Sequence, residues 1–243
     1  MPISLLTLNI EGDNHLDKIQ QLIDEKHPDV VCFQEIYKAD LPIFQKQLQV
    51  KSVFVPSSRI ESENKFRLKP KGEWGVAIFS RIPLFTAHIH AYVGELNHVP
   101  VYENGEPNLT NRVVIVAKFH LDNKPLYIAT THFTWADKGD ATELQHKNLD
   151  QLLQVVESYR PLVFCGDFNA PRGKSVFERL ATEFTDNIPT HVTSSIDPDL
   201  HRVKGIELMV DGMFSSPGIH VNDVEVIQGV SDHKAVFGRI SFH

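Results

Sequence analysis

Acidic, amide and histidine side chains recur in this sequence where apolar runs end. Asn9 and Glu11 follow the run ISLLTL, and Glu35 follows VVCFQ. The remaining members of this set are His132 after YIATT, Asp167 and Asn169 after LVFCG, Asp211 after ELMV, and Asp232 and His233 before the last apolar run. One such residue is usually a turn former or a helix cap. So many in the same placement predict a shared site, because ligand sites in α/β proteins gather where strand ends converge.

The chemistry available to these side chains is that of metal-assisted phosphoester hydrolysis. Mg²⁺ and Mn²⁺ prefer oxygen ligands, which Glu11 and Glu35 can supply. Asp167 can orient or deprotonate a water molecule. The neutral amides of Asn9 and Asn169 can hold a phosphoryl group and the carboxylates in register without adding negative charge.

Asp211 and His233 are predicted to act as a pair. A hydrogen bond to the Asp211 carboxylate would fix the tautomer of His233 and favour the cationic imidazole. A cationic histidine stabilises the charge that develops during phosphoryl transfer. No G-x-S-x-G motif is present and neither cysteine is next to a histidine in the sequence, so no covalent nucleophile is predicted.

The elements that position these residues follow from hydrophobic periodicity. Runs rich in Val, Ile, Phe and Thr between turn residues predict strands. Several runs are apolar on both faces, as is typical of strands buried between two layers. The predicted strands are Ser4–Ile10, Val30–Gln34, Ser52–Pro56, Trp74–Ser80, Val113–His120, Leu126–His132, Leu162–Cys165, Met209–Phe214, Val224–Gln228 and Ala235–Ile240.

Apolar residues at helical spacing predict four helices. They cover residues 16–23 after an Asn14 N-cap, residues 41–48 with Pro42 in the first turn, Asp140 to about Tyr159, and a segment from Ser175 in which Glu178 completes a capping box. Residues 57–72, 94–111 and 185–206 are predicted as loops. Strands and helices without strict alternation predict a layered α/β sandwich of mixed or antiparallel sheets. No repeat or linker divides the chain, so one domain over residues 1–243 is expected.

Composition places the chain among ordinary globular proteins. Of 243 residues, 42% are hydrophobic and 23% are charged, which excludes a disordered, collagen-like or coiled-coil chain. No apolar run approaches the roughly 18 residues that cross a bilayer. The N-terminal segment has no basic region and is predicted as a strand, not a signal peptide. We therefore expect no membrane insertion, a cytoplasmic location and a monomer.

The two cysteines lie inside predicted strands. Cys32 occurs in VVCFQE and Cys165 in LVFCGDFN, and neither belongs to a zinc-binding spacing. Buried free thiols in a reducing compartment are the prediction, and a disulfide between them stays open as the alternative.

Acidic residues outnumber basic ones, 31 to 24, so the net charge is −7 with histidines counted as neutral. A polyanion would therefore need a local positive patch. In an extended chain, alternation with Phe66, Leu68 and Pro70 would place four basic residues on one face, either as a phosphate-binding stripe or as a solvated edge strand. These four are Lys65, Arg67, Lys69 and Lys71.

Each of the other candidates for substrate binding could instead have a purely structural role. Arg172 and Lys174 follow GDFNAP and are predicted either to bind an anionic substrate or to occupy a loop-to-helix junction. His201-Arg202 lies in the long loop, where it either contacts phosphate or is simply solvated. Trp135 is either a platform for base stacking or a packing residue.

The motifs together resemble the endonuclease/exonuclease/phosphatase superfamily, the Mg²⁺-dependent group that includes DNase I-like enzymes, abasic-site endonucleases and tyrosyl-DNA phosphodiesterase 2. They occur in the family order over nearly the whole chain. The matching segments are Leu8-Asn9-Ile10-Glu11, Pro28-Asp29-Val30-Val31-Cys32-Phe33-Gln34-Glu35, Gly75-Val76-Ala77-Ile78-Phe79-Ser80-Arg81, Thr131-His132-Phe133, Gly166-Asp167-Phe168-Asn169, Val210-Asp211 and Ser231-Asp232-His233. Each is weak alone, and their order makes the resemblance strong.

The resemblance implies a role for each matching residue. Glu35 would be the main metal ligand, with Asn9, Glu11 and Asp232 close to the metal; the family more often has Asp where Glu11 stands. The other implied roles are water positioning by Asp167, phosphate contact by Asn169, contact with a phosphate oxygen by His233 with support from Asp211, and contact with phosphate or leaving group by His132. The implied fold is a four-layered α/β sandwich, with two central mixed β-sheets flanked by helices.

The predicted function is therefore a Mg²⁺- or Mn²⁺-dependent phosphodiesterase, with nucleic acid as its substrate. A lipid or small-molecule phosphodiesterase or phosphatase of the same superfamily is the first alternative. It is less favoured, because no exposed apolar hairpin is evident and the P-S-W-C-D-R type signature is absent near Asp211. The second alternative, a catalytically inactive binding module, conflicts with the chemically competent residue at every position that we can identify.

Overall fold

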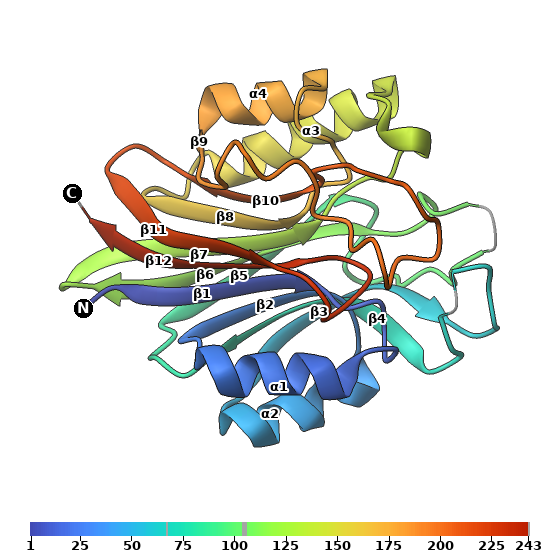
Figure 1. The fold of residues 1–243 in the computed structure, drawn as a ribbon, viewed down its shortest axis with the longest axis horizontal. Coiled ribbons are helices and arrows are strands. Elements are labelled where there is room, and N and C mark those ends of the chain that lie inside the picture. The colour runs from blue at the N-terminus through green and yellow to red at the C-terminus, as the bar shows by residue number, and fades with distance from the viewer. Residues whose placement is uncertain (67, 104–105, 243) are drawn as a thin grey trace.

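Two six-stranded β-sheets pack face to face between two layers of helices (Figure 1). The computed structural model describes residues 1–66, 68–103 and 106–242. The first sheet contains, in spatial order, β11 (Ile219–Ile227), β12 (Ala235–Phe242), β1 (Ile3–Asn9), β2 (Val30–Tyr37), β4 (Gly72–Ser80) and β3 (Ser52–Ile60). The second contains β5 (Thr86–Val93), β6 (Arg112–Leu121), β7 (Lys124–His132), β8 (Leu162–Asp167), β10 (Asp211–Ser215) and β9 (Thr185–Asp186).

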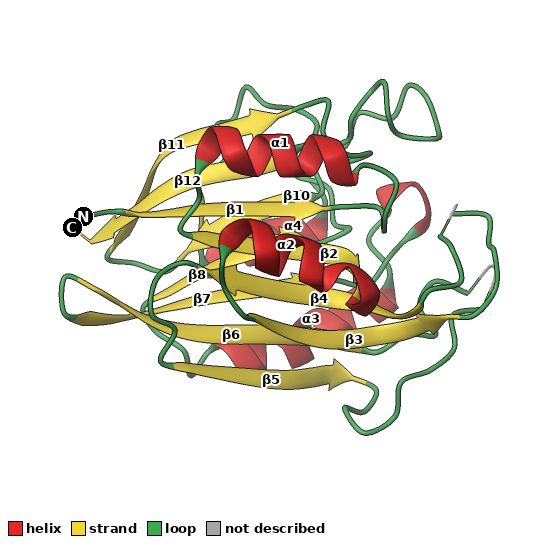
Figure 2. Ribbon diagram, turned by 90° about the horizontal axis from the view of Figure 1, so that it is seen from below, coloured by secondary structure: helices red, strands yellow, loops and turns green. Residues whose placement is uncertain are grey.

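The helices cover the outer faces of the two sheets. α1 (Leu16–Lys26) and α2 (Leu41–Leu48) lie on the first sheet, and α3 (Glu143–Val156) and α4 (Ser175–Glu183) lie on the second (Figures 1 and 2). Single turns of 3₁₀ helix occur at Lys38–Asp40 and Asp137–Gly139. This arrangement confirms the predicted four-layered sandwich with two central mixed sheets.

Three apolar interfaces hold the layers together, and the side-chain alternation along β2 shows why. Cys32 faces the second sheet and packs in the cluster between the sheets, whereas its neighbour Phe33 faces α2 and contacts Phe44 edge to face. Both are fully buried, so β2 has no solvent-facing side. Burial of a large apolar side chain such as Phe33 stabilises the fold by about 1.5–3 kcal/mol. Cys32 and Cys165 are both buried and free, as predicted.

Within the described residues, all ten predicted strands are present, together with two more that the sequence pattern missed. β5 is an edge strand with a half-exposed face, so its apolar content is low, and β9 has only two residues. β3 continues to Ile60, so the predicted loop at 57–72 begins later. Among the helices in the described part of the chain, none is long and apolar enough to cross a membrane.

The predicted helix starts need correction. α1 begins after His15 instead of Asn14, and α3 begins at Glu143 because Thr142 Oγ1 caps it by accepting from the backbone N–H of Gln145. The predicted capping box at Ser175 is also absent. Ser175 is the first helical residue and not the N-cap, and the Glu178 carboxylate accepts a hydrogen bond from the N–H of Gly173.

Candidate active site

The carboxyl ends of two parallel strand pairs meet at one end of the sandwich. β1 and β2 pair in parallel, and so do β7 and β8, whose last residues His132 and Asp167 lie side by side. The Asn9 amide joins the two sheets, because its Nδ2 donates to Glu35 Oε1 at 3.1 Å and to Asp167 Oδ2 at 3.0 Å. This end is opposite the chain termini, which lie together (Figure 2).

Two antiparallel strands bring further side chains to the same edge. β10 runs antiparallel to β8, which places Asp211 opposite Asp167. His233 lies two residues before β12, which runs antiparallel to β1. The sequence pattern placed Asp211 at the end of an apolar run, but in the structure Asp211 is the first residue of β10. It still reaches the site, because an antiparallel strand starts where its neighbour ends.

Three residues of the site have backbone conformations that are unusual for residues other than glycine. Glu11, Glu35 and Asn169 have φ values of 49°, 62° and 47°. Glu35 also lies where the pairing of β2 with β4 shifts register, which is a β-bulge that turns its side chain toward the cavity. Such left-handed conformations cost free energy and are concentrated at functional sites.

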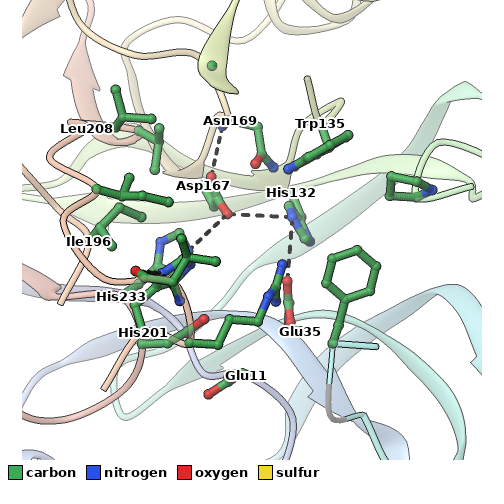
Figure 3. A pocket seen from close by; sticks show the side chains of 18 of the residues that line it. Glu11, Glu35, His132, Trp135, Asp167, Asn169, Ile196, His201, Leu208 and His233 are labelled. Atoms are coloured by element: carbon green, nitrogen blue, oxygen red, sulfur yellow. Dashed lines mark hydrogen bonds and ion pairs between the residues drawn. The ribbon is translucent and has the colours of Figure 1, made fainter. Parts of the chain in front are cut away.

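Asp167 lies at the centre of the cluster, and both of its carboxylate oxygens are held (Figure 3). Oδ1 accepts from the backbone N–H of Asn169 at 2.8 Å, and Oδ2 accepts from Asn9. The preceding Gly166 has φ of 138°, and a Cβ there would lie 2.1 Å from the carbonyl oxygen of Thr131. Only glycine therefore allows β8 to approach β7 closely enough to place Asp167 beside His132.

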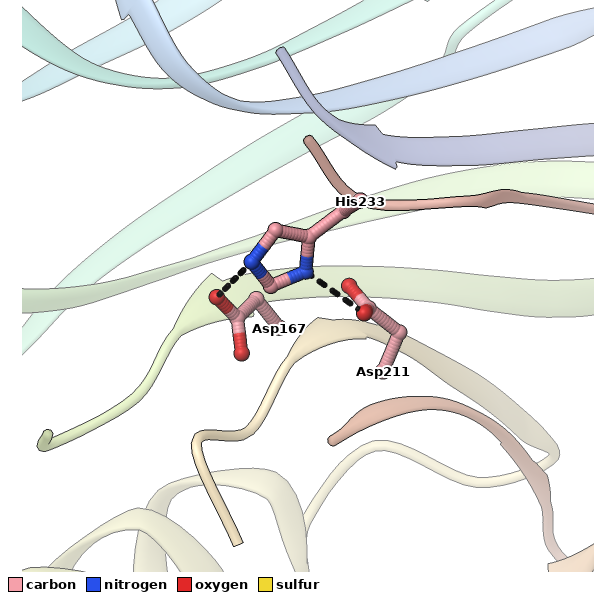
Figure 4. Close-up of side chains that lie close together, drawn as sticks. All are labelled: Asp167, Asp211 and His233. Carbon is pink, nitrogen blue, oxygen red and sulfur yellow. Dashed lines mark hydrogen bonds and ion pairs between the residues drawn. The ribbon is translucent and has the colours of Figure 1, made fainter. Parts of the chain in front are cut away.

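His233 lies between two carboxylates (Figure 4). Its Nδ1 is 2.7 Å from Asp211 Oδ2, and its Nε2 is 3.9 Å from Asp167 Oδ2. Burial by itself would lower the pKa of His233, but Asp211, Asp167 and Asp232 outweigh it and raise the pKa well above its usual value. The predicted Asp211–His233 pair is thus present in the geometry that favours the imidazolium.

His132 has the opposite electrostatic character. Its Nε2 is 3.5 Å from Asp167 Oδ2 and 3.8 Å from Glu35 Oε1. Burial lowers the pKa of His132 to about 4, and the nearby Arg112 guanidinium adds to the effect although Asp167 opposes it. The surroundings of the two histidines therefore act in opposite directions, since those of His132 favour its neutral imidazole and those of His233 favour its imidazolium.

Three further carboxylates, those of Glu35, Asp232 and Glu11, line the cavity, and no Lys or Arg side chain of the described residues forms an ion pair with them. Burial, with the charges of Asp232 and Asp167, raises the pKa of Glu35 to about 8. Burial also raises the pKa of Asp232, an effect that Glu11 strengthens and His233 opposes. Glu11 Oε1 is buried and has no hydrogen-bond partner, while Oε2 is 3.0 Å from His15 Nε2. Oxygen atoms in this state fit a hard divalent cation.

A second group of potential ligand atoms belongs to Asp167, Asp211 and His233, which lie within 4.8 Å of one another. We assign this group to hydrogen bonding and not to a metal ion. The 2.7 Å separation of His233 Nδ1 and Asp211 Oδ2 is a direct hydrogen bond that occupies both atoms, whereas Glu11 Oε1 has no hydrogen-bond partner. The side of the site that contains Glu35 is therefore the better metal position.

A comparison with protein families identifies the family of this chain. The sequence profile of the endonuclease/exonuclease/phosphatase family matches residues 6–233. The chain belongs to this family. Members of the endonuclease/exonuclease/phosphatase family are hydrolases that act on phosphoester bonds. No curated protein sequence matched the chain.

Solved structures of the family share the fold at low sequence identity. A family member from Bacteroides vulgatus superposes with a TM-score of 0.76 and 17% identity, covering 100% of both chains. D. rerio TDP2 humanized by 14 mutations has a TM-score of 0.69 and 14% identity over 99% of this chain and 99% of its own. Mannosyl-6-phosphatase of Bacteroides thetaiotaomicron has a TM-score of 0.68 and 14% identity over 99% of this chain and 100% of its own.

The structure brings the catalytic and metal-binding candidates of this family member together. Those that line one cavity are Glu11, Glu35, His132, Asp167, Asn169, Asp232 and His233. Asn9 and Asp211 lie behind them and contact Asp167 and His233 through hydrogen bonds. Trp135, His201 and Arg202 also line the cavity. Their positions are compatible with the substrate-binding roles that the sequence left open beside purely structural ones.

The substrate-binding candidates do not gather there. Arg172 donates to Asp186 at 2.6 Å and to backbone carbonyls of residues 188–192, so it fastens a loop. Lys174 pairs at the surface with Asp140. The alternation predicted to align the basic stripe is also wrong, because described residues 61–71 form turns and not a strand. Arg67 lies outside the described residues.

Within that loop, two lysines are occupied by carboxylates. Lys69 pairs with Asp13 at 3.0 Å, and Lys71 contacts Asp13 at 3.1 Å and Asp40 at 2.7 Å. Lys65 lies over the ring of Phe66 at 5.1 Å from its centroid. Lys69 and Lys71 therefore fix the loop to the body of the protein, and their charges are neutralised there.

Lys71→Ser is expected to lower the free energy of unfolding by about 1–3 kcal/mol, because it leaves the buried Asp40 carboxylate without its donor. Urea unfolding of the variant, beside Lys51→Ser at an exposed position, measures this effect. An unchanged stability combined with weaker oligonucleotide binding would instead restore the phosphate-binding interpretation of this lysine.

Sequence reasoning missed three residues that shape the site. His15 supports Glu11, and the Glu-x-x-x-His spacing was the available signal. Arg112 is 4% exposed and donates to the carbonyls of His132, Phe133 and Pro107. Tyr102 lines the cavity from a loop. Neither Arg112 nor Tyr102 had a local signal, because each is brought to the site only by the packing of distant segments.

Proposed function

We propose that this chain hydrolyses a phosphoester bond of nucleic acid or of a nucleotide, with Mg²⁺ or Mn²⁺ as its cofactor. The observation that carries this proposal is the group of buried and partly buried acidic side chains, Glu11, Glu35 and Asp232, beside the Asp167 carboxylate. Glu35 has a pKa of about 8, and Glu11 Oε1 is buried without a partner. A divalent cation would neutralise both.

The residues that would hold the ion are Glu35, Glu11 and Asp232, with Asn9 fixing the orientation of Glu35. When bound, the ion supplies Lewis-acid polarisation of a phosphoryl oxygen. The backbone strain at Glu11 and Glu35 is consistent with this role, because it holds both carboxylates toward the cavity before any ligand arrives.

The protein's own groups divide the remaining chemistry. Asp167 accepts a hydrogen bond from the attacking water and takes its proton, while Asn9 and the Asn169 N–H keep the carboxylate in place. His233, charged by its carboxylate neighbours, donates from Nε2 to a phosphoryl oxygen as negative charge grows. Neutral His132 offers a hydrogen bond to the phosphoryl or leaving-group oxygen.

A specific observation favours a second candidate within this proposal, a small phosphoester in place of a polymer. A long nucleic acid is bound chiefly through phosphate contacts to Lys and Arg. Here Lys69, Lys71 and Arg172 are engaged with carboxylates of the protein. A free nucleotide or the end of a strand requires far fewer cations than an internal segment.

Removal of divalent metal is expected to abolish hydrolysis of bis(p-nitrophenyl) phosphate, and added Mg²⁺ or Mn²⁺ should restore it. Turnover that persists in excess EDTA would exclude the metal-dependent mechanism. An oligonucleotide assayed in parallel reports on the substrate class.

Metal affinity itself provides a readout that needs no turnover. Because the pKa of Glu35 is about 8, a proton competes with the cation below that pH. Mn²⁺ binding followed by calorimetry should therefore release protons at neutral pH and tighten as the pH rises toward 8. Glu35→Gln should remove both effects, whereas Glu157→Gln, an exposed control, should not.

A further inference from the structure

A row of aromatic rings leads away from the catalytic cluster. The ring centroid of His132 is 5.8 Å from that of Trp74, Trp74 is 6.3 Å from Tyr102, and Tyr102 is 6.1 Å from Phe66. All three contacts are edge to face. We call Trp74, Tyr102 and Phe66 the aromatic wall. It forms one continuous side of the cavity from the reacting groups to the 61–71 loop.

Arg202 closes the far end of this wall. Its guanidinium carbon lies 4.4 Å from the ring centroid of Phe66, a cation–π contact between two loops that are distant in sequence. Within the part of the chain that the structure describes, no carboxylate is within ion-pair distance of Arg202, in contrast to Lys71 and Arg172. Stacking occupies the face of a guanidinium and leaves its N–H edge available to bind an anion bidentately.

The opposite side of the cavity is aliphatic. Ile196 and Leu208 lie there together in the close-up (Figure 3), and Val203 and Ile206 also line it. The cavity has a volume of about 390 Å³, within the range that encloses a drug-sized molecule. A planar base with its sugar is of this size and could be held between the aromatic and aliphatic sides.

We propose that Arg202, stacked on Phe66, binds a second phosphate of the substrate, so that the preferred substrate is a nucleotide with two phosphates. One phosphate is hydrolysed at Asp167 and His233, and the other is held at the end of the aromatic wall. The nucleotide is either free or the terminal residue of a strand. This assignment rests on the proposed phosphoesterase function and specifies its substrate.

Two chromogenic substrates isolate the contribution of the second phosphate. Thymidine 5′-(p-nitrophenyl phosphate) and its 3′-phosphorylated form release the same p-nitrophenolate and differ only in the additional phosphate. Wild-type protein with Mg²⁺ should prefer the 3′-phosphorylated substrate in kcat/KM. Arg202→Gln should reduce that preference ~10-fold or more, chiefly through KM, since a charge-assisted contact is lost. Arg202→Lys, which keeps the charge without the planar fork, should fall between them.

Arg81→Gln is the matched control, because it removes the same charge at an exposed position in the turn after β4. It should leave both turnover and preference unchanged. An equal preference in wild type and Arg202→Gln overturns the assignment of Arg202, and if both substrates are still hydrolysed with metal, the proposed phosphoesterase function stands.

Calorimetry with products keeps the assignment testable if neither chromogenic ester is turned over. Thymidine 3′,5′-bisphosphate should bind wild type more tightly than thymidine 5′-monophosphate, and Arg202→Gln should remove the difference. Equal affinities in wild type would contradict the second-phosphate site whatever the activity. Competition by a short single strand with a terminal 3′-phosphate then separates a strand end from a free nucleotide, because a free-nucleotide site would not bind the strand.

Discussion

Asp167→Asn is expected to lower kcat by at least ~100-fold, the lower end for the loss of a general base. The amide cannot take a proton from water, although it has the shape of the carboxylate. The position is sensitive because Asp167 is 1% exposed and oriented by two hydrogen bonds, one from Asn9 and one from the Asn169 N–H. A small displacement would misalign the water even if another base were present.

The loss should appear in kcat with Mn²⁺ affinity and thermal unfolding retained, because Glu35 and Glu11 are untouched. Asp150→Asn is the control for the same isosteric change on the exposed face of α3. If Asp167→Asn turns over within a few-fold of wild type, then Asp167 does not position the attacking water and another carboxylate of the cluster must.

His233→Ala and Asp211→Ala are each expected to reduce kcat/KM strongly, by about 100-fold for His233, and the double variant should lose less than the product of the two factors. The reason is the 2.7 Å hydrogen bond between Nδ1 and Oδ2, through which Asp211 acts on His233. Once the imidazole is absent, the carboxylate has nothing left to orient, so the two effects are not additive.

A pH profile distinguishes this coupling from a merely structural role of Asp211. The neighbouring carboxylates hold the pKa of His233 well above its usual value, so activity that needs the imidazolium is lost as the pH rises through that raised pKa. Asp211→Asn removes one of those charges and should shift the alkaline limb of kcat/KM to lower pH. Multiplicative losses in the double variant, or an unmoved alkaline limb, would show that the two residues act independently.

The layered α/β fold, and the polar residues that the fold gathers at the carboxyl ends of β1, β2, β7 and β8, could be predicted from the sequence. Strands buried on both faces consist of consecutive apolar residues, as in the run that contains Cys32 and Phe33. Their positions can therefore be predicted from the local sequence pattern. The residues that end such runs can be identified in the same way. Asn9, Glu35 and Asp167 each follow an apolar run, and the fold joins them by the two hydrogen bonds of the Asn9 amide.

Which cations face the cavity, in contrast, depends on contacts between segments that are distant in sequence. The alternation of basic and apolar residues predicted that Lys69 and Lys71 lie on one face. In the structure they form ion pairs with Asp13 and Asp40, which are far away in sequence. Arg202 had no distinguishing motif and yet lies at the end of the aromatic wall. The physical reason is the range of the forces involved. Hydrophobic periodicity is a local property of the chain, whereas the partner of a flexible charged side chain is whichever opposite charge or ring the completed fold brings within a few ångströms.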